Sequence, residues 1–216
     1  MREGGPVERE APDFEAETAQ NESTMPMVSR LANFINTATA EVMEANKTLS
    51  HMAVTDRLTQ LYNRGEIQRR INERILAHCA DPTGENVTSL VMIDLDDFKH
   101  INDTCGHQEG DQVLIAVSGL IREAVTALDG ASGGRWGGEE FMLLLPGLNA
   151  DRAAEAAESL RVKIEALTFT LCKGETASFG VAQALPGEAP DPLIFRTDEA
   201  LYAAKRDGKN RVCVAE

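Results

Sequence analysis

The sequence predicts an α+β domain, with a sheet that contains antiparallel strands and is backed by helices, after one long N-terminal helix. Three observations carry this prediction. From residue 55 onward, short apolar runs typical of strands alternate with stretches in which apolar residues recur every three or four positions. Before residue 55, only the helical spacing is found. The 216 residues, 43% of them apolar, can bury one good core, so we expect one catalytic-sized domain with appendages.

Residues 1–26 are predicted to form a disordered acidic tail. This stretch is rich in Glu, contains Pro6, Pro12 and Pro26, and has few large apolar residues. Burying so little apolar surface cannot offset the chain entropy that folding removes.

Residues 27–54 predict a helix that pairs with a second copy of itself. Apolar residues alternate at spacings of three and four, at Val28, Leu31, Ile35, Ala38, Val42, Ala45, Leu49 and Met52. Val28, Ile35 and Val42 are β-branched residues at the first, third and fifth seam positions, which favours a parallel two-stranded coiled coil and a homodimer. The flanking positions carry almost no charge and the alanines make the seam thin, so a single helix packed on its own domain is the alternative.

Residues 55–216 predict the catalytic-sized domain. Helices are expected over residues 63–79, around 113–128, from a cap at Asn149 or Asp151 to about Leu167, and over 197–205. Strands are expected at residues 89–95, 141–145, 177–182 and 211–214, with a hairpin turn at 135–138. The first of these strands is continuously apolar, as a central strand buried on both faces would be.

Charge and composition exclude several functional classes. The net charge of −14 argues against a nucleic-acid or anionic-membrane surface, because its field repels phosphates. No stretch approaches the roughly 20 apolar residues of a membrane span, and the N-terminus is acidic where a signal peptide is basic. The cysteines are scattered without a CxxC pair, so we expect reduced thiols in a cytoplasmic protein. A membrane sensor could still have been cut away from this chain.

A first group of acids closes the predicted central strand. Asp94, Asp96 and Asp97 are followed directly by Phe98 and Lys99. Three crowded carboxylates repel one another and call for a cation, and hard oxygen ligands suit Mg²⁺. Lys99 would add a positive charge for substrate phosphates. Taken alone, such a run is also typical of a solvated turn.

A second group lies at the predicted hairpin. Gly137 and Gly138 immediately precede Glu139, Glu140 and Phe141. Paired glycines let the backbone approach a ligand or adopt positive φ. Two neighbouring acids in a strand point to opposite faces, so only one of them can share the face of the metal-binding acids. Taken alone, the stretch also fits a hairpin whose acids are simply solvated.

Together with their neighbours, these two stretches resemble the GGDEF family of diguanylate cyclases. The resemblance covers about residues 55–214 and rests on motifs in a fixed order: residues 56–64, 94–103, Gly106-His107 with Gly110-Asp111, the Gly-Gly-Glu-Glu-Phe variant of the signature at 137–141, 178–181, and 200–205 running into 208–211. It implies a ferredoxin-like or palm-like sheet with a βααββαβ core, flanked by helices.

The resemblance also implies roles for individual residues. Asp94, Glu139 and the main-chain carbonyl of Leu95 would bind Mg²⁺, with Mn²⁺ as a substitute. Glu139 would also accept the proton of the GTP 3′-hydroxyl. Lys99 would stabilise charge on the transferring phosphate, together with amides around Phe98. The expected substrate contacts are Asn102, His107 and Asp111 on the guanine side, and Lys205 and Lys209 on the phosphates, with Lys209 standing where an arginine is common.

The implied reaction condenses two GTP molecules into cyclic di-GMP and two pyrophosphates, in a dimer with one GTP half-site per subunit and an unidentified upstream sensor. The family's product-inhibition motif, Arg-x-x-Asp, would need Arg at Leu128 and Asp at Ala131, so no feedback through that site is expected. Residues 132–134, Ser-Gly-Gly, are expected to loosen the hairpin edge. The alternatives are a silent relative that only binds GTP or cyclic di-GMP, and a related cyclase acting on one nucleotide. The retained acids and lysine favour the diguanylate cyclase.

Overall fold

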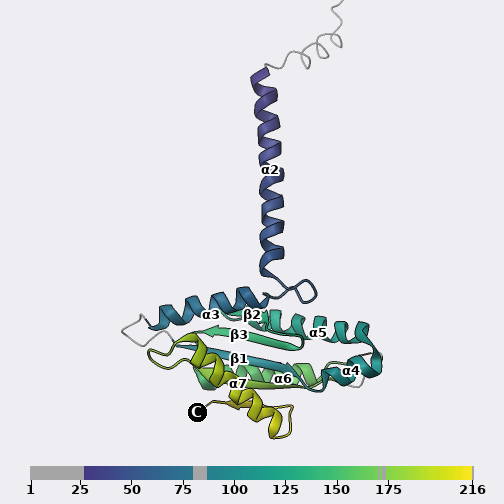
Figure 1. Cartoon of the computed structure of the whole chain (residues 1–216), viewed down its shortest axis with the longest axis vertical. Helices are drawn as coiled ribbons and strands as arrows, with labels where there is room; N and C mark the ends of the chain where they lie inside the picture. The colour runs from purple at the N-terminus through teal and green to yellow at the C-terminus, as the bar shows by residue number, and fades with distance from the viewer. Residues whose placement is uncertain (1–26, 80–86, 170, 172–173, 216) are drawn as a thin grey trace, which may run out of the picture. The chain divides into compact units, whose positions relative to one another are not determined.

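A computed structural model describes residues 27–79, 87–169, 171 and 174–215, and the predicted tail at 1–26 lies outside these ranges. Two compact units are found, Met1–Ser50 and His51–Glu216. The elements are α2 (Met27–Val54), α3 (Arg64–Cys79), β1 (Thr88–Leu95), α4 (Phe98–Cys105), α5 (His107–Thr126), β2 (Ser132–Arg135), β3 (Glu140–Pro146), α6 (Ala150–Glu165), β4 (Ala177–Gln183), α7 (Pro190–Arg206) and β5 (Val212–Val214) (Figure 1).

The second unit is built on one five-stranded sheet in the order β2-β3-β1-β4-β5. Neighbouring strands are antiparallel except β4 and β5, which are parallel. Every residue of β1 is buried, as its unbroken apolar run predicted. The α+β architecture expected from the sequence is therefore confirmed, and β1 presents its carboxyl end at the middle of the sheet.

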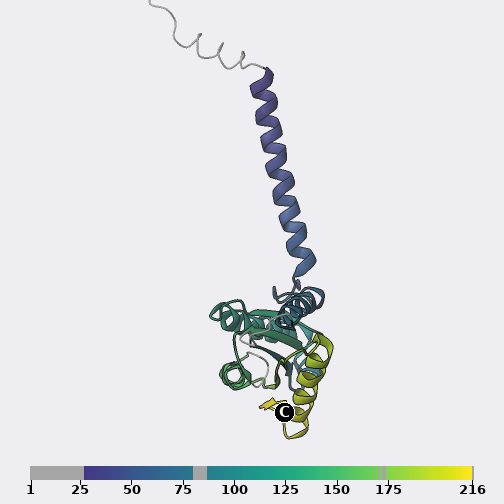
Figure 2. The same cartoon turned by 90° about the vertical axis from the view of Figure 1, so that its left-hand side faces the viewer.

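Helices cover both faces of the sheet, and each face has its own core (Figure 2). On one face, side chains such as Val91 and Ile93 pack with residues of α4, α5 and α6. On the other face, Leu90 and Met92 pack with residues of α3 and α7. This alternation follows from the period of two in a strand. Because the two cores take up the apolar side chains along β1, polar groups such as Asp94 can lie at the end of the strand.

The glycines of β2 close this edge of the sheet instead of loosening it. A Cβ atom added at Gly134 would lie 2.5 Å from Cβ of Ile67, and one added at Gly133 would lie 2.8 Å from Cγ2 of Ile121. Only glycine therefore lets α3 and α5 approach the strand this closely. Residues 56–64, which we call the entrance segment, also cover the outer edge, because Tyr62 N donates to the Gly133 carbonyl at 3.2 Å.

Several element boundaries differ from the sequence expectation for physical reasons. Helix α7 begins at Pro190 and not near residue 197, because proline is tolerated in a first helical turn where no N–H is needed. Of the two cap candidates for α6, Asn149 is the cap, and its side chain accepts from Arg152 N at 3.0 Å. Cys105 is disulfide-bonded, so the expectation of reduced thiols is wrong there. Spacing along the chain does not reveal which cysteines fold together.

The first unit consists of most of α2. The apolar side chains exposed along it by more than half of their area are Met27, Leu31, Phe34, Ile35, Val42 and Met43. Leu31, Ile35 and Val42 belong to the predicted seam, and more than half of each of these three side chains is exposed. None of the helices in the described ranges has the length and apolar character that a bilayer crossing requires.

Candidate active site

A small pocket of about 220 Å³ opens where β1 ends. It collects residues from four separate stretches of the chain: the end of β1, the first turn of α4, the turn before β3, and the end of α7 with the loop that follows. The lining residues are Asp94, Leu95, Asp96, Asp97, Phe98, Lys99, Glu139, Lys205 and Lys209. All of the residues predicted for the metal and for the phosphates thus meet in one place.

Asp94 is the more buried of the two acids predicted to bind the metal, at 8% exposure. Its Oδ2 lies 2.8 Å from Nζ of Lys205. Burial raises the pKa of the Asp94 carboxyl, the ammonium of Lys205 acts against that change, and Glu139 and Glu140 add to it. An acid held in this way gains from a divalent cation, which would offset both the burial and the neighbouring negative charges.

Glu139 and Glu140 both lie near Asp94, but in different ways. Across the β1–β3 ladder Glu140 is the partner of Asp94, and cross-strand partners direct their side chains to the same face. Glu139 comes before the first residue of β3, so the strict alternation of a strand does not govern it. It lines the pocket with Asp94, and its carbonyl accepts from Leu95 N at 3.4 Å. A Cβ atom added at Gly137 would lie 2.3 Å from Oε2 of Glu140, so the Glu140 carboxylate turns back over Gly137.

Asp96 has a different part from the one its motif suggested. Its carboxylate is 6% exposed and accepts three hydrogen bonds, from Thr176 Oγ1 and Ser178 Oγ at 2.7 Å each and from Asn210 N at 3.0 Å. The negative charge is therefore compensated by protein donors and needs no cation. Asp96 joins β1 to β4 and to the loop that carries Lys209. No pattern in the sequence pointed to these partners.

Asp97 and the loop after α7 are held in strained backbone conformations. Asp97, Lys209 and Asn210 have φ of 56°, 61° and 47°, in the left-handed region that non-glycine residues seldom occupy. The Lys209 ammonium lies 2.6 Å from Oδ1 of Asp97, and this hydrogen bond raises the pKa of Lys209. Strain of this kind persists where the surroundings enforce it, commonly at functional sites.

The donor set around Asp94 suits a divalent cation. Two carboxylates and one carbonyl, from Asp94, Glu139 and Leu95, are hard oxygen ligands of the type that Mg²⁺ prefers. Within the described ranges, no group of three or more His, Cys, Asp or Glu side chains is arranged to hold a metal by itself. A cation at this pocket would thus complete its shell with water and substrate, as Mg²⁺ usually does with phosphates.

Comparison with known families decides what kind of domain this is. The family model described as "Diguanylate cyclase, GGDEF domain" matches residues 53–211. The chain belongs to the GGDEF family. Diguanylate cyclase DgcM of Escherichia coli is 39% identical over 175 residues, which make up 81% of this chain and 42% of DgcM. Diguanylate cyclase VdcA of Vibrio cholerae is 38% identical over 195 residues, 84% of this chain and 54% of VdcA. The chain therefore spans about half or less of the length of these relatives.

Solved structures of GGDEF domains share the fold. The coiled coil and GGDEF domain of DgcB from Caulobacter crescentus, in complex with c-di-GMP, matches with a TM-score of 0.79 and 30% identity, over 88% of this chain and 100% of that one. The active GGEEF domain of a diguanylate cyclase from Vibrio cholerae matches with a TM-score of 0.66 and 30% identity, over 72% of this chain and 98% of that one.

The guanine-side residues predicted for this GGDEF domain do not line the pocket. Asn102 lies on α4, and a Cβ atom added at Gly110 would come within 2.1 Å of its Oδ1, so glycine is needed there for α4 and α5 to meet. His107 opens α5 and Asp111 lies one turn on, both exposed. All three residues come after the first turn of α4 in the chain. The N-terminus of α4 has no side-chain cap.

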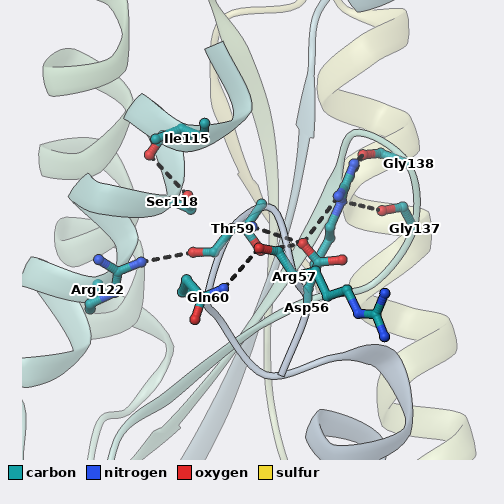
Figure 3. A network of polar contacts seen from close by, with 10 residues as sticks. Asp56, Arg57, Thr59, Gln60, Ile115, Ser118, Arg122, Gly137 and Gly138 are labelled. Atoms are coloured by element: carbon teal, nitrogen blue, oxygen red, sulfur yellow. Dashed lines mark hydrogen bonds and ion pairs between the residues drawn. The ribbon is translucent and has the colours of Figure 1, made fainter. Parts of the chain in front are cut away.

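A polar network holds the signature hairpin in place, and sequence reasoning gave no role to two of its members, Arg135 and Asp56. Arg135 Nε donates to the carbonyls of Gly137 at 3.1 Å and Gly138 at 3.0 Å, and its Nη1 lies 3.1 Å from Oδ1 of Asp56. Asp56 in turn accepts from the amide and hydroxyl of Thr59 at 2.9 and 2.8 Å (Figure 3). Burial acts to raise the pKa of Asp56, but these hydrogen bonds and the Arg135 charge outweigh it and lower the pKa.

Proposed function

We propose that this chain is a diguanylate cyclase that condenses two GTP molecules into cyclic di-GMP and two pyrophosphates. The observation that carries the proposal is the pocket at the end of β1, where Asp94 and Glu139 lie with Lys99, Lys205 and Lys209. Phosphoryl transfer depends mainly on positioning and on neutralising charge, and this pocket offers acids for a cation beside cations for phosphates. The Gly-Gly-Glu-Glu-Phe stretch is in this proposal the working form of the family signature.

The proposed metal ligands are Asp94, Glu139 and the Leu95 carbonyl. A bound Mg²⁺, or Mn²⁺ in its place, would polarise the α-phosphate and lower the pKa of the attacking hydroxyl. Glu139 lines the pocket at the end of β1, and we propose its carboxylate as the acceptor of the 3′-hydroxyl proton. Burial of Asp94 makes a cation more favourable at this position than at an exposed turn.

The lysines are proposed to bind the triphosphate. Lys99 is exposed in the first turn of α4, where the uncapped amide end of the helix also favours an anion. Lys205 and Lys209 pair with Asp94 and Asp97 in this structure, which keeps them at the pocket. As GTP arrives, these ammonium groups would exchange carboxylate for phosphate without leaving the site. Phe98 is buried at 7% and would support the loop from below.

The proposed guanine contacts are Asn102, His107 and Asp111. A carboxylate at Asp111 can accept hydrogen bonds from N1 and N2 of guanine, both of which are donors that adenine lacks. This supports GTP over ATP as the substrate. Because GTP is the proposed substrate, the proposal places the reaction in the cytoplasm.

Cyclic di-GMP contains two nucleotides, so two half-sites must face each other. We propose that two copies of the chain pair through α2, whose seam residues Leu31, Ile35 and Val42 are exposed by more than half. Burying such a seam against an identical helix is favourable and keeps two catalytic domains at high effective concentration. An upstream sensor, not identified by anything in this chain, would act by changing the register or phase of the pair.

Feedback through a site just before the signature is not part of the proposal. Leu128 and Ala131 stand where the Arg and Asp of the inhibitory motif would be, and both pack against the apolar core. Neither side chain can bind a phosphate or a guanine. An isotherm with tight cyclic di-GMP binding that is abolished by changes at residues 128–131 would contradict this.

Incubation with GTP and Mg²⁺, followed by chromatography, tests the proposed activity directly. Cyclic di-GMP is the expected product, and it should form faster per chain as the concentration of chain increases, because two half-sites must meet. No product would favour a silent GTP-binding relative, and a cyclic mononucleotide would favour a one-nucleotide cyclase. A matched variant, Asp94→Asn, removes the charge with little change in shape and is expected to abolish the reaction.

A further inference from the structure

A second and larger cavity, of about 490 Å³, lies next to the phosphate pocket. It is bordered by α4, by the end of β1 and by the segment that leads into β4. Asp96 and Asp97 line both this cavity and the phosphate pocket, so the two share a wall. The proposed guanine-side residues are absent from its described lining, so it is a separate space. Its volume falls in the range of small-molecule sites. We call it the α4 cavity.

The α4 cavity contains a buried acid with an unpaired carboxylate oxygen. Glu175 is 3% exposed and lines the cavity, and its Oε1 has no hydrogen-bond partner. It precedes Ala177 and Phe179 by two and four residues, and both of these are core residues with no exposed area. Glu175 is therefore a buried acid next to core residues, at a position where an apolar side chain would avoid the free-energy cost of burying a polar group. A buried polar group that gives up water without gaining a partner is unfavourable.

Burial and neighbouring negative charges destabilise a charged Glu175, so a bound cation would be stabilising there. Burial raises the pKa of Glu175, and the carboxylates of Asp96, Asp97 and Asp94 add to this effect. No lysine or arginine is found in the described lining of the cavity. The charge of the described lining therefore favours a cationic ligand over an anionic one. Ile101 and Leu171 provide apolar surface on the same lining, which suits the methylene groups of an organic molecule.

We propose that the α4 cavity is a binding site for a small organic cation with an amine or guanidinium group, and that Glu175 is its acceptor. A bare metal ion fits less well. The described residues contain no group of three metal-ligating side chains, and the space is far larger than one ion needs. A guanidinium matches the planar fork of a carboxylate, and an alkyl chain matches the apolar wall.

Occupancy of the α4 cavity would be coupled to the phosphate pocket through the shared wall. Asp97 faces both spaces and holds Lys209 at 2.6 Å. A cation bound beside Glu175 reduces the negative potential that an incoming triphosphate meets there. Binding of the cation and of GTP should therefore favour each other, since coupling between two sites is reciprocal. This goes beyond the proposed cyclase activity, because the ligand is neither substrate nor product.

Calorimetry with agmatine, in the absence of GTP, tests the site on the full chain. The neutral probe is butylurea, which keeps the alkyl chain and the planar head but has no charge. The variants are Glu175→Leu, which removes the acid, and Asp103→Asn, which removes an exposed acid from the same helix α4 and controls for the overall acidity. We expect agmatine to bind the unmodified chain and Asp103→Asn alike, and to bind Glu175→Leu at least about tenfold more weakly.

The inference is overturned if Glu175→Leu binds agmatine as well as the unmodified chain does, if butylurea binds equally, or if agmatine does not bind at millimolar concentration. Should Glu175→Leu fail to fold, Glu175→Gln gives the same comparison with the shape retained. The KM for GTP should fall with agmatine in the unmodified chain and in Asp103→Asn, but not in Glu175→Leu. If no cyclic di-GMP forms while agmatine still binds through Glu175, the cyclase proposal fails and the cavity inference stands.

Discussion

The ammonium of Lys205 lies 2.8 Å from Oδ2 of Asp94, the acid that closes the central strand. The lysine is on α7 and the acid on β1, so an ion pair between segments distant in the sequence compensates the negative charge of Asp94. Without a metal, Lys205 is the cation that compensates a carboxylate whose burial would otherwise leave it unpaired. A divalent ion must therefore compete with Lys205 for Asp94, and a triphosphate can release the lysine for that purpose.

This competition gives the first prediction, for Lys205→Ala. Without the lysine, Mn²⁺ alone should bind more tightly to the nucleotide-free chain, since Asp94 has lost its competing cation. The KM for GTP should rise about tenfold, the cost of one charge-assisted hydrogen bond to phosphate. Titration of Mn²⁺ by electron paramagnetic resonance and initial-rate kinetics measure the two effects. Lys205→Arg is the control and should stay near the unmodified values. An unchanged KM in the alanine variant would remove Lys205 from the substrate site.

The sequence was sufficient to predict the local part of this site. Asp94 and Lys99 belong to one short run and Glu139 to another, and the resemblance of these runs to the GGDEF family predicted a pocket in which they meet. What it did not reveal are contacts between strands. The donors to Asp96 come from Thr176, Ser178 and Asn210, 80 to 114 residues away, and only the sheet register brings them together.

The same limit explains the errors about the fold. Residues 132–134 were expected to weaken the edge of the sheet, because glycine is a poor strand residue. Their effect on packing depends instead on how closely α3 and α5 approach β2, where a larger residue would collide with them. Arg135 beside paired glycines was visible as a charge without a stated role, and its pairing with Asp56 follows from the fold alone. Glu175 could have been singled out as an acid two residues before an apolar strand, which is a local conflict of the kind found at functional sites.

The two acids of the signature should differ in effect. Glu139→Gln is expected to lower kcat/KM about a thousandfold or more and to weaken metal binding, because it removes both a proposed ligand and the proposed proton acceptor. Glu140→Gln should have a smaller effect, since its carboxylate turns back over Gly137. Steady-state kinetics at several Mg²⁺ concentrations make the comparison. The reverse ranking would assign the ligand to Glu140, which the β1–β3 register places opposite Asp94.

Arg135 should link the entrance segment to the hairpin. Arg135→Ala removes donors to the carbonyls of Gly137 and Gly138, so we expect kcat to fall and the free energy of unfolding to drop by about 2 kcal/mol. Combined with Asp56→Ala in a double-mutant cycle, the coupling should be about 1 kcal/mol. Lys163→Ala is the control. Its ion pair with Glu123 is exposed on both sides and should contribute under about 0.5 kcal/mol. Additive losses for Arg135 and Asp56 would mean that no link exists.

Gly134 should be intolerant of even one added methyl group. In Gly134→Ala the new Cβ atom would lie 2.5 Å from Cβ of Ile67, which has no exposed area and little room to move. We expect a loss of about 2 kcal/mol in the free energy of unfolding. Gly119→Ala, in α5 with open space around it, should instead stabilise the chain by roughly 0.5 to 1 kcal/mol. Urea unfolding measures both. Equal effects would show that α3 can move away from β2.

Glu175 should make stability fall as the pH rises. Burial, with the charges of Asp96, Asp97 and Asp94, raises the pKa of Glu175 from 4.5 to about 8. Between these values the folded chain keeps a proton that the unfolded chain has released. The stability contributed by protonated Glu175 is therefore fully present below pH 4.5 and is lost as the pH rises toward 8.

Glu175→Leu isolates this contribution. The difference in free energy of unfolding between the variant and the unmodified chain should grow in favour of leucine, by about 1.4 kcal/mol per pH unit near pH 6 to 7, and level off at both ends. Chemical unfolding from pH 4 to 8.5, in buffer with a metal chelator, gives the curve. The chelator matters because a cation near Asp94 would weaken the field on Glu175. A difference that stays constant over this range would show that the acid is charged in the folded chain and already has a partner.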